Sequence, residues 1–200
     1  MTKSFEFHFD FGGPNSYLAH KMLPQFCSQH DAEAVYVPIS LGGLFKITNN
    51  QAPLMRYAET PAKQKYEMLE FQRFVKAHEI PFNMNPRFPL NTLYVMRGAV
   101  AAQRLNCLVP YVDAVMTAMW YDRADVGDLN VVRDVLDKAG LDSVALLALA
   151  ENPEVKAELM ANTEAAAKRG AFGVPTFFVG DEMFWGKERL GQIEVELTKS

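Results

Sequence analysis

Strand patterns stand near both ends of this 200-residue chain, and about a hundred residues of mostly helical pattern separate them. Phe5 to Phe11 places an aromatic residue at every second position, which indicates a strand with one strongly apolar face. Gly12 to Ser16 then indicates a tight turn into a helix, whose apolar positions are Leu18, Met22 and Phe26. A chain that begins in this way and returns to strand after a long helical block brings distant segments into one sheet.

The remaining strands fit the same sheet. Glu33 to Ile39 is a second strand, so the chain opens as β-α-β, and such openings have parallel strands with a right-handed crossover. Near the other end, Thr176 to Val179 and Glu182 to Trp185 flank a Gly180-Asp181 turn, which predicts a β-hairpin. A final helix follows, and its core face consists of Leu190, Ile193 and Leu197.

The middle of the chain is predicted to be helical after an irregular stretch over Leu41 to Ala58. Thr60 is expected to cap a helix that starts at Pro61 and runs to His78. In the first helix, Pro24 is expected to cause a kink or to loosen the end. Further helices are expected around Leu93, Met96 and Val100, and over Pro110–Tyr121, Asp128–Lys138, Asp142–Ala150 and Pro153–Lys168, the last capped by Asn152.

This order of elements predicts an α/β protein with a thioredoxin-like fold, β-α-β followed by β-β-α, that is interrupted by an all-helical insertion. We expect residues 1–45 and 170–200 to form the thioredoxin-like domain and residues 46–169 to form the helical insertion domain. The length suits one core-bearing domain with a sizeable insertion. The hydrophobic fraction of 49% is ordinary for a globular protein and too high for a disordered one.

Charge and cysteine content exclude several classes of protein. Lys and Arg total 20 against 24 Asp and Glu, with no long basic run, so we expect no nucleic-acid partner. No apolar stretch is long enough to cross a membrane, and the first residues lack the apolar centre of a signal peptide, so we expect a cytoplasmic protein. Cys27 and Cys107 fit neither CxxC nor a zinc motif; we expect buried free thiols and no metal.

Three segments carry candidate functional residues, and each also has a purely structural interpretation. The turn Gly12 to Ser16 begins a helix, whose N-terminal N–H groups favour a bound anion or thiolate, but it also suits an ordinary βα turn. Gly173 to Thr176 suits a cis Pro175 that exposes backbone groups to an extended peptide, or a trans proline in an edge strand. Thr48 to Gln51, with Lys63 and Lys65 beyond it, suits peptide and carboxylate binding or a solvated turn.

Together these segments resemble a known family. The matching motifs are FDFGGPNSYLA at Phe9–Ala19, LGGLFKITNN at Leu41–Asn50, PAKQKY at Pro61–Tyr66 and GAFGVPTFFVGDEMFWGKERL at Gly170–Leu190. They resemble the 2-hydroxychromene-2-carboxylate isomerases, which are relatives of kappa-class glutathione transferases in the DsbA-like thioredoxin superfamily. The resemblance spans essentially the whole chain. It implies a thioredoxin fold with a helical insertion, glutathione in the cleft between them, and a homodimer.

The resemblance also implies roles for individual residues. Glutathione contacts are expected from the side chains of Asn50, Lys63, Lys187 and Glu188 and from the backbone of Val174 ahead of a cis Pro175. The family pattern at the last helix is Ser or Lys followed by Asp, so Glu188 departs from it mildly. The segment between Asn50 and Lys63 is a few residues longer here than in the kappa enzymes.

One departure concerns the catalytic position itself. The family places a thiolate-stabilising serine immediately before Pro14, where this chain has Gly13, and the nearest polar side chains are Asn15 and Ser16. Lowering a thiol pKa from about 8.5 to about 6.5 takes roughly 2.7 kcal/mol. A helix N-terminus supplies about 0.3–1 kcal/mol, or about 2 when partly buried, and a hydrogen bond to a charged group about 1.5–3. Activation of the thiol is therefore expected either to be weaker or to be supplied by Ser16, Asn15 or a water.

These observations support one leading function and two alternatives. The leading hypothesis is a glutathione-dependent isomerase that acts by reversible thiolate addition to a conjugated aromatic enol-pyruvate substrate, with Arg87, Asn91 and Tyr94 as candidates for binding the substrate carboxylate. The alternatives are a kappa-like glutathione transferase acting on electrophilic small molecules and a non-catalytic glutathione- or peptide-binding protein. A disulfide oxidoreductase is disfavoured, because the first turn has Gly13 to Ser16 in place of CxxC.

Overall fold

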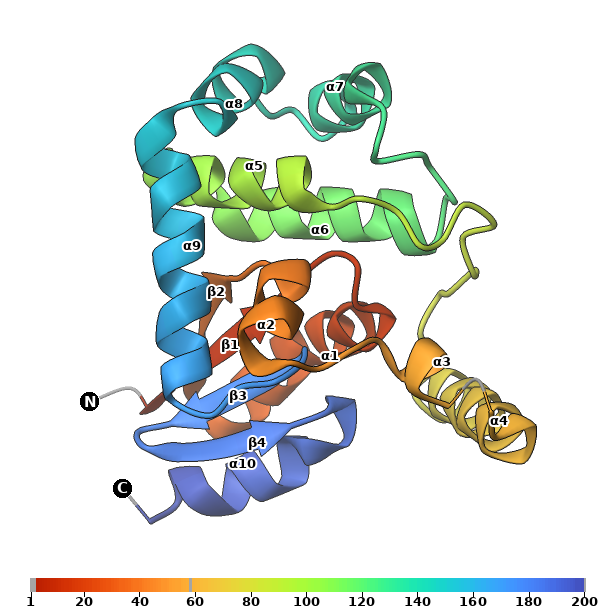
Figure 1. The fold of residues 1–200 in the computed structure, drawn as a ribbon. Coiled ribbons are helices and arrows are strands. Elements are labelled where there is room, and N and C mark those ends of the chain that lie inside the picture. The colour runs from red at the N-terminus through yellow and green to blue at the C-terminus, as the bar shows by residue number, and fades with distance from the viewer. Residues whose placement is uncertain (1–2, 58, 200) are drawn as a thin grey trace.

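The computed structural model describes residues 3–57 and 59–199, and its centre is one mixed sheet (Figure 1). The strands are β1 (Lys3–Phe9), β2 (Ala32–Pro38), β3 (Thr176–Val179) and β4 (Glu182–Trp185), in the order β2-β1-β3-β4. β1 runs parallel to β2 and antiparallel to β3, with His8 opposite Thr176. The predicted β-α-β opening, its parallel strands and the β3–β4 hairpin are confirmed. Residues 1–2, 58 and 200, which the expected domain and loop boundaries include, lie outside the described residues.

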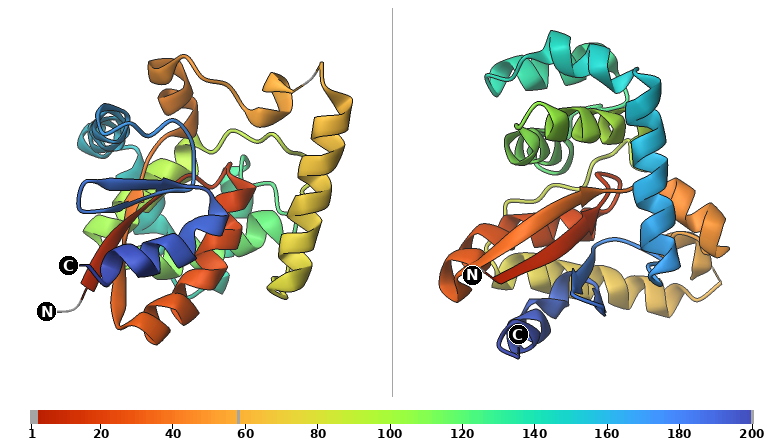
Figure 2. Two further views of the ribbon diagram at one scale, coloured as in Figure 1. Left: turned by 90° about the horizontal axis from the view of Figure 1, so that it is seen from below. Right: turned by 90° about the vertical axis from the view of Figure 1, so that its left-hand side faces the viewer.

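β1 is buried on both faces, so the prediction of one apolar face is incomplete. Phe5, Phe7 and Phe9 are at most 2% exposed, but His8 and Asp10 are also nearly inaccessible, at 3% and 2%. The reason is that β1 is an inner strand between β2 and β3, with helices on both faces of the sheet (Figure 2). The phenylalanines face α1 and α10, while the opposite face packs under α2 and α9.

The first two helices frame the turn after β1. α1 (Pro14–His30) begins with proline at its first turn and contains Pro24, yet it continues to His30. The prediction of an irregular stretch after β2 is wrong, because α2 (Leu41–Thr48) and the short α3 (Pro53–Arg56) form there. α2 starts despite its two glycines because the Ser40 side chain accepts a hydrogen bond from the Gly43 N–H and Leu44 is fully buried.

The helical block follows the predicted boundaries closely. Its members are α4 (Pro61–Ala77), α5 (Leu93–Arg104), α6 (Leu108–Trp120), α7 (Leu129–Lys138), α8 (Ser143–Ala150) and α9 (Pro153–Lys168). Asn152 caps α9 as expected, whereas Thr60 makes no side-chain cap for α4. In Figure 1, α5 to α8 form layers above the sheet, α9 returns along the left-hand side, and α4 lies apart at the lower right.

The chain closes with a short 3-10 helix, η1 (Lys187–Arg189), and α10 (Leu190–Leu197), whose predicted core face of Leu190, Ile193 and Leu197 is buried. One hydrophobic cluster runs from the sheet through α1 into the helical block, joining residues such as Phe9, Val100 and Trp120. Within the described ranges, no helix combines the length and apolar character needed to cross a membrane.

Candidate functional site

The turn after β1 places the N-terminus of α1 against the loop that precedes β3. Gly13 is the N-cap residue of α1, with an extended backbone at φ −97°, and makes no side-chain cap. Its carbonyl accepts hydrogen bonds from the N–H groups of Ser16 at 2.8 Å and Tyr17 at 3.3 Å. Pro14 has no N–H, and the Asn15 N–H has no partner among the described residues. The start of α1 therefore offers the Asn15 amide and the partial positive charge of the helix to an anion.

Two side chains of this first turn carry buried polar atoms without a partner. Ser16 is 0% exposed, and its Oγ has no hydrogen-bond partner within the described part of the chain. The Oδ1 of Asn15 is likewise buried and unpaired. Leaving such a group unpaired costs about 1–3 kcal/mol, so folded proteins satisfy nearly all of them. Unpaired polar atoms at a helix N-terminus are thus a feature of a ligand-binding turn.

The Gly173 to Thr176 loop lies directly against this turn. The Val174–Pro175 peptide bond is cis, as predicted. A β-carbon added to Gly13 would stand 2.7 Å from the Val174 Cγ2 and 2.9 Å from the Ser16 Oγ. The predicted convergence of the two segments is therefore present. Neither the N–H nor the C=O of Val174 has a hydrogen-bond partner in the structure as described, which leaves both groups able to pair with an extended ligand.

Asn50 and Lys63 have different positions relative to that loop. The Nδ2 of Asn50 donates to the Phe172 carbonyl at 2.9 Å, which ties the end of α2 to the loop before Val174. Its Oδ1 accepts a bond from Arg56 at 3.3 Å. Lys63 is exposed on α4, with its Nζ 3.8 Å from the centre of the Tyr57 ring. Asn50 is thus bonded to the loop before Val174, whereas Lys63 contacts Tyr57, which precedes α4 in the chain.

Lys187 and Glu188 begin η1, which packs against α1. Lys187 is unusual for a lysine because it is only 6% exposed. Its ammonium forms an ion pair with Glu188 and lies 4.7 Å from the centre of the Phe74 ring of α4. Lys63 and Phe74 are eleven residues apart, about three helical turns, so they share one face of α4. The Lys63 and Lys187 positions therefore lie along the same side of that helix.

The three residues expected to bind a substrate carboxylate have other partners. Arg87 pairs with Asp125 at 3.5 Å, and the Oδ1 of Asn91 accepts from the Leu93 N–H at 3.0 Å. The Tyr94 hydroxyl donates to the Leu147 carbonyl at 2.9 Å, and burial raises its pKa. Among the described contacts, none joins these side chains to the turn at Gly13.

Sequence reasoning missed Asp10 and Thr92, which meet beneath the turn. Asp10 lies under the turn, where its Oδ1 accepts bonds from the Gly12 N–H at 2.8 Å and from the Thr92 hydroxyl at 2.6 Å. Its Oδ2 accepts from the Leu41 N–H at 2.7 Å. One carboxyl group thus holds the turn, the start of α2 and the start of α5. Burial raises the pKa of Asp10, although the three hydrogen bonds oppose that shift. The sequence signal that could have indicated Asp10 is a single Asp directly after the strand of alternating phenylalanines.

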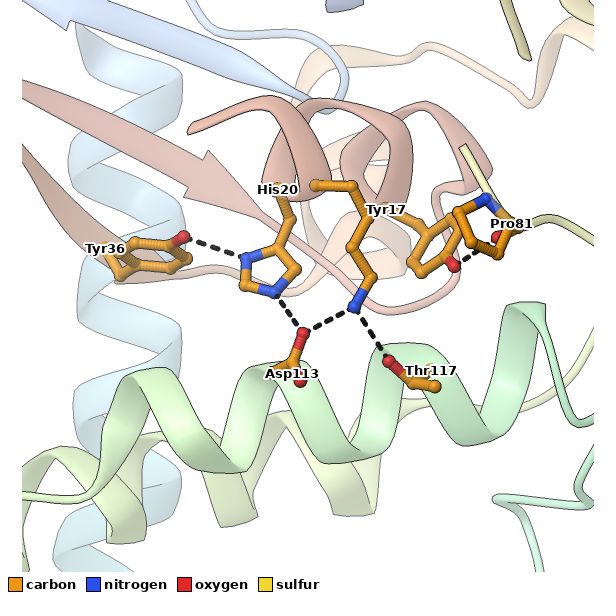
Figure 3. A network of polar contacts seen from close by, with 7 residues as sticks. Tyr17, His20, Tyr36, Pro81, Asp113 and Thr117 are labelled. Atoms are coloured by element: carbon orange, nitrogen blue, oxygen red, sulfur yellow. Dashed lines mark hydrogen bonds and ion pairs between the residues drawn. The ribbon is translucent and has the colours of Figure 1, made fainter. Parts of the chain in front are cut away.

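The far side of α1 is anchored to the helical block by a second polar network, shown in Figure 3. His20 Nδ1 lies 2.8 Å from the Tyr36 hydroxyl, and its Nε2 lies 3.2 Å from Asp113 Oδ1 on α6. The Lys21 ammonium contacts the same Asp113 oxygen at 2.5 Å and the Thr117 hydroxyl at 3.0 Å. The hydrogen bonds from His20 and Lys21 lower the pKa of Asp113. The network fixes the helix whose N-terminus forms the site.

Comparison with known proteins agrees with this architecture. The family model for the DsbA-like thioredoxin domain matches residues 5–198. A 2-hydroxychromene-2-carboxylate isomerase of Sphingobium xenophagum is 30% identical over 97% of each chain. Rat glutathione S-transferase kappa 1 is 25% identical over 86% of this chain and 78% of the relative. A solved 2-hydroxychromene-2-carboxylate isomerase structure superposes with a TM-score of 0.84 at 28% identity, covering 98% of this chain and 95% of that chain.

The family match extends over almost the entire sequence, and the isomerase relatives align with 94–97% of the chain. The expectation of a thioredoxin-like fold with a helical insertion is therefore confirmed. The chain belongs to the DsbA-like thioredoxin family, in the branch that contains the 2-hydroxychromene-2-carboxylate isomerases, and it is an enzyme.

Proposed function

We propose that this enzyme is a glutathione-dependent isomerase of the 2-hydroxychromene-2-carboxylate isomerase type. The observation that carries the proposal is the pair of unpaired groups at the start of α1, the Ser16 hydroxyl and the Asn15 N–H, beside the free backbone of Val174. Bound glutathione would supply a thiolate that adds reversibly to a conjugated substrate carbon and so permits rotation about a former double bond. The remaining task of the protein is to bind the tripeptide and to favour the ionised sulfur.

The residues of the site fit a tripeptide of this chemistry. The Val174 N–H and C=O would pair with the backbone of the cysteinyl unit, as a strand edge pairs with an added strand. Lys187 and Glu188 would contact the γ-glutamyl end, with the buried ammonium paired to Glu188 and 4.7 Å from the centre of the Phe74 ring. Asn50 already binds the loop through Phe172, so its role would be to hold the loop while its Oδ1 faces Arg56. Lys63 would hold the opposite carboxylate.

Thiolate stabilisation is assigned to Ser16 rather than to position 13. Ser16 Oγ lies 2.9 Å from the point that a Gly13 side chain would occupy, so it stands close to where the family serine begins. A hydroxyl that donates to a charged sulfur contributes about 1.5–3 kcal/mol, which covers most of the 2.7 kcal/mol that a neutral-pH thiolate requires. Val174 Cγ2 lies 2.7 Å from the same point, so the hydroxyl and the Val174 loop both border the position that a residue-13 side chain would take.

A kappa-like glutathione transferase is the second candidate, because the rat relative carries that name. The two activities share the thiolate and differ in whether the sulfur adduct is released as product or reversed. Two assays, both run with excess glutathione, separate these activities. One measures isomerisation of an aromatic enol-pyruvate, and the other measures conjugation of glutathione to an activated aryl halide. Isomerisation without consumption of glutathione supports the isomerase, and stoichiometric loss of the thiol supports the transferase.

The experiment that tests glutathione dependence is a calorimetric titration with reduced glutathione and with S-methylglutathione. We expect both to bind, and only the first to support turnover. At about 100 times the dissociation constant, glutathione should raise the free energy of unfolding by about 2.7 kcal/mol. Absence of heat and of any thermal shift at tens of millimolar ligand contradicts the proposal. The homodimer and the cytoplasmic location implied by the resemblance stay predictions, as do Arg87, Asn91 and Tyr94 as carboxylate ligands.

A further inference from the structure

Arg56 ends a short helix that lies beside the loop proposed to bind glutathione. This helix, α3, begins at Pro53, whose ring fixes the backbone angle of a first helical turn. The Ala52 carbonyl then accepts hydrogen bonds from the Met55 N–H at 2.9 Å and the Arg56 N–H at 3.0 Å. The turn brings the Arg56 side chain back to Asn50, six residues earlier, whose Oδ1 accepts a hydrogen bond from the guanidinium Nη1 at 3.3 Å.

Asn50 links this guanidinium to the loop. Its backbone N–H donates to the Phe45 carbonyl at 3.0 Å, which fixes Asn50 at the end of α2. Its Nδ2 donates to the Phe172 carbonyl at 2.9 Å, and Phe172 is two residues before Val174. The two ends of one amide group therefore hold the loop on one side and Arg56 on the other.

The charge of Arg56 is available to a ligand. Its side chain is exposed, and no acidic side chain within residues 3–57 and 59–199 forms an ion pair with it. A guanidinium has five N–H donors in a planar fork that matches a carboxylate, and one bond to Asn50 leaves most of them free. The ammonium of Lys63, the other cation expected at this end, lies over the Tyr57 ring instead.

The direction of a tripeptide along the loop follows from the assignment of its γ-glutamyl end. The Gly186 N–H donates to the Pro175 carbonyl at 3.0 Å, and Lys187 comes next in the chain, so the γ-glutamyl end extends past Pro175. With the cysteinyl unit paired to Val174, the glycyl end extends the other way, toward Phe172. One extended residue spans about 3.3–3.6 Å, which brings the glycine carboxylate to the end of the loop that Asn50 and Arg56 border.

We propose that Arg56 binds the glycine carboxylate of glutathione, with Asn50 holding both the guanidinium and the loop in position. Lys63 is then a second cation at the same end of the ligand. This inference rests on the proposed function, because it concerns how the same tripeptide is recognised. It makes Arg56 a specificity-determining residue that distinguishes glutathione from thiols without a carboxylate at this position.

The test compares reduced glutathione with its glycyl monoethyl ester, in which only the glycine carboxylate is blocked. Calorimetric titration of the full chain measures both affinities. We expect the wild type to bind the ester about tenfold more weakly than glutathione, the usual size of a lost charged hydrogen bond. Arg56→Gln keeps an amide that can bond to Asn50 but has no charge, and it should reduce this ratio to about threefold or less. Its affinity for the ester should equal that of the wild type.

The matched control is Lys46→Gln, which removes an exposed positive charge from α2 and should keep the wild-type ratio. The ester separates a lost contact from a disturbed loop. If Arg56 only supported the loop through Asn50, Arg56→Gln would weaken both ligands equally, and the unchanged ratio would overturn the proposal. A ratio that is kept in Arg56→Gln and lost in Lys63→Gln also overturns it, because Lys63 alone then binds the carboxylate.

The wild type alone distinguishes this proposal from the proposed function. Equal affinity for glutathione and its ester overturns the role of Arg56 and leaves glutathione binding intact. Absence of binding by both ligands overturns the proposed function and the role of Arg56 together.

Discussion

The Val174 Cγ2 atom occupies the space that a side chain on Gly13 would need, 2.7 Å from the ideal position of its β-carbon. The backbone of Gly13 is not the obstacle, since its φ of −97° suits any residue. What the glycine permits is the close approach of the Val174 loop to the start of α1. The glycine at position 13, where the resemblance implies a serine, and the position of the valine are therefore two parts of one local packing arrangement.

Restoring the serine alone should consequently destabilise the protein. We expect Gly13→Ser to lower the free energy of unfolding by about 1–3 kcal/mol, the usual cost of overpacking. Val174→Ala removes the tighter of the two close contacts and leaves the Ser16 Oγ, at 2.9 Å, to rotate aside. A double-mutant cycle should therefore show a favourable coupling of about 1 kcal/mol or more. Urea unfolding of the four proteins measures this. Additive effects would mean that the two side chains do not compete for the same space.

The Gly13→Ser/Val174→Ala protein also tests the role of position 13 in activation. We expect it to have a lower bound-thiol pKa than Val174→Ala alone, because the new hydroxyl adds a donor beside the sulfur. The thiolate absorbance of bound glutathione during a pH titration measures this difference. An unchanged thiol pKa in a folded double variant would show that position 13 does not face the sulfur.

Removal of the Ser16 hydroxyl should affect stability and activation in opposite directions. Ser16→Ala eliminates a buried group that has no partner, so the ligand-free protein should unfold with a free energy that is unchanged or up to about 1 kcal/mol higher. The pKa of bound glutathione should rise by about one to two, which corresponds to a lost hydrogen bond of about 1.5–3 kcal/mol. Ser143→Ala, which alters a buried serine of α8, is the control and should leave the thiol pKa unchanged. A stability loss in Ser16→Ala with no change in thiol pKa would make Ser16 a structural residue.

The two cysteines are expected to be dispensable for catalysis. Burial raises the pKa of both the Cys27 and the Cys107 thiol, so each is a poor nucleophile at neutral pH. The double substitution of both by alanine should cost about 1 kcal/mol of stability and leave glutathione-dependent turnover unchanged. Thermal unfolding and the isomerisation assay measure the two quantities. Loss of turnover in a stably folded double variant would reveal a redox role.

Much of the fold was predictable because its signals are local. Alternation in β1, the proline at the start of α4 and the Asn152 cap of α9 each act within a few residues. The stretch after β2 was not predictable, because its glycines argue against a helix and only the Ser40 cap and the burial of Leu44 stabilise one. Secondary structure there depends on a cap and on packing against α9.

The site was predictable only in part, for a related reason. The motifs led to Ser16 and Val174, which lie in short segments that the fold brings together. Asp10 and Thr92 are 82 residues apart and meet only in the folded chain, so no spacing could have paired them. The same applies to His20 and Asp113, which join α1 to α6 across 93 residues.

The Asp10 carboxyl should make stability depend on pH in a defined direction. Its pKa is raised in the folded protein by burial, above an ordinary value of 3.8. The folded state therefore keeps the proton to higher pH than the unfolded state does, and the stability that Asp10 contributes is complete below pH 3.8 and declines as pH rises through the folded-state pKa. Asp10→Asn removes this titration, but its amide can accept only one of the two backbone N–H groups of Gly12 and Leu41. At neutral pH we thus expect it to cost about 1–3 kcal/mol.

Urea unfolding of the wild type and of Asp10→Asn from pH 4 to pH 8 tests this expectation. The difference in unfolding free energy between them should be largest at the acid end and should shrink as pH rises, because only the wild type loses its proton. Asp181→Asn, which changes an exposed carboxylate in the β3–β4 turn, is the control for the general effect of charge. The three hydrogen bonds that Asp10 accepts favour its ionised form, whereas its burial favours the protonated form. A difference that grows with pH would mean that these bonds outweigh the burial and that Asp10 holds the turn as an anion.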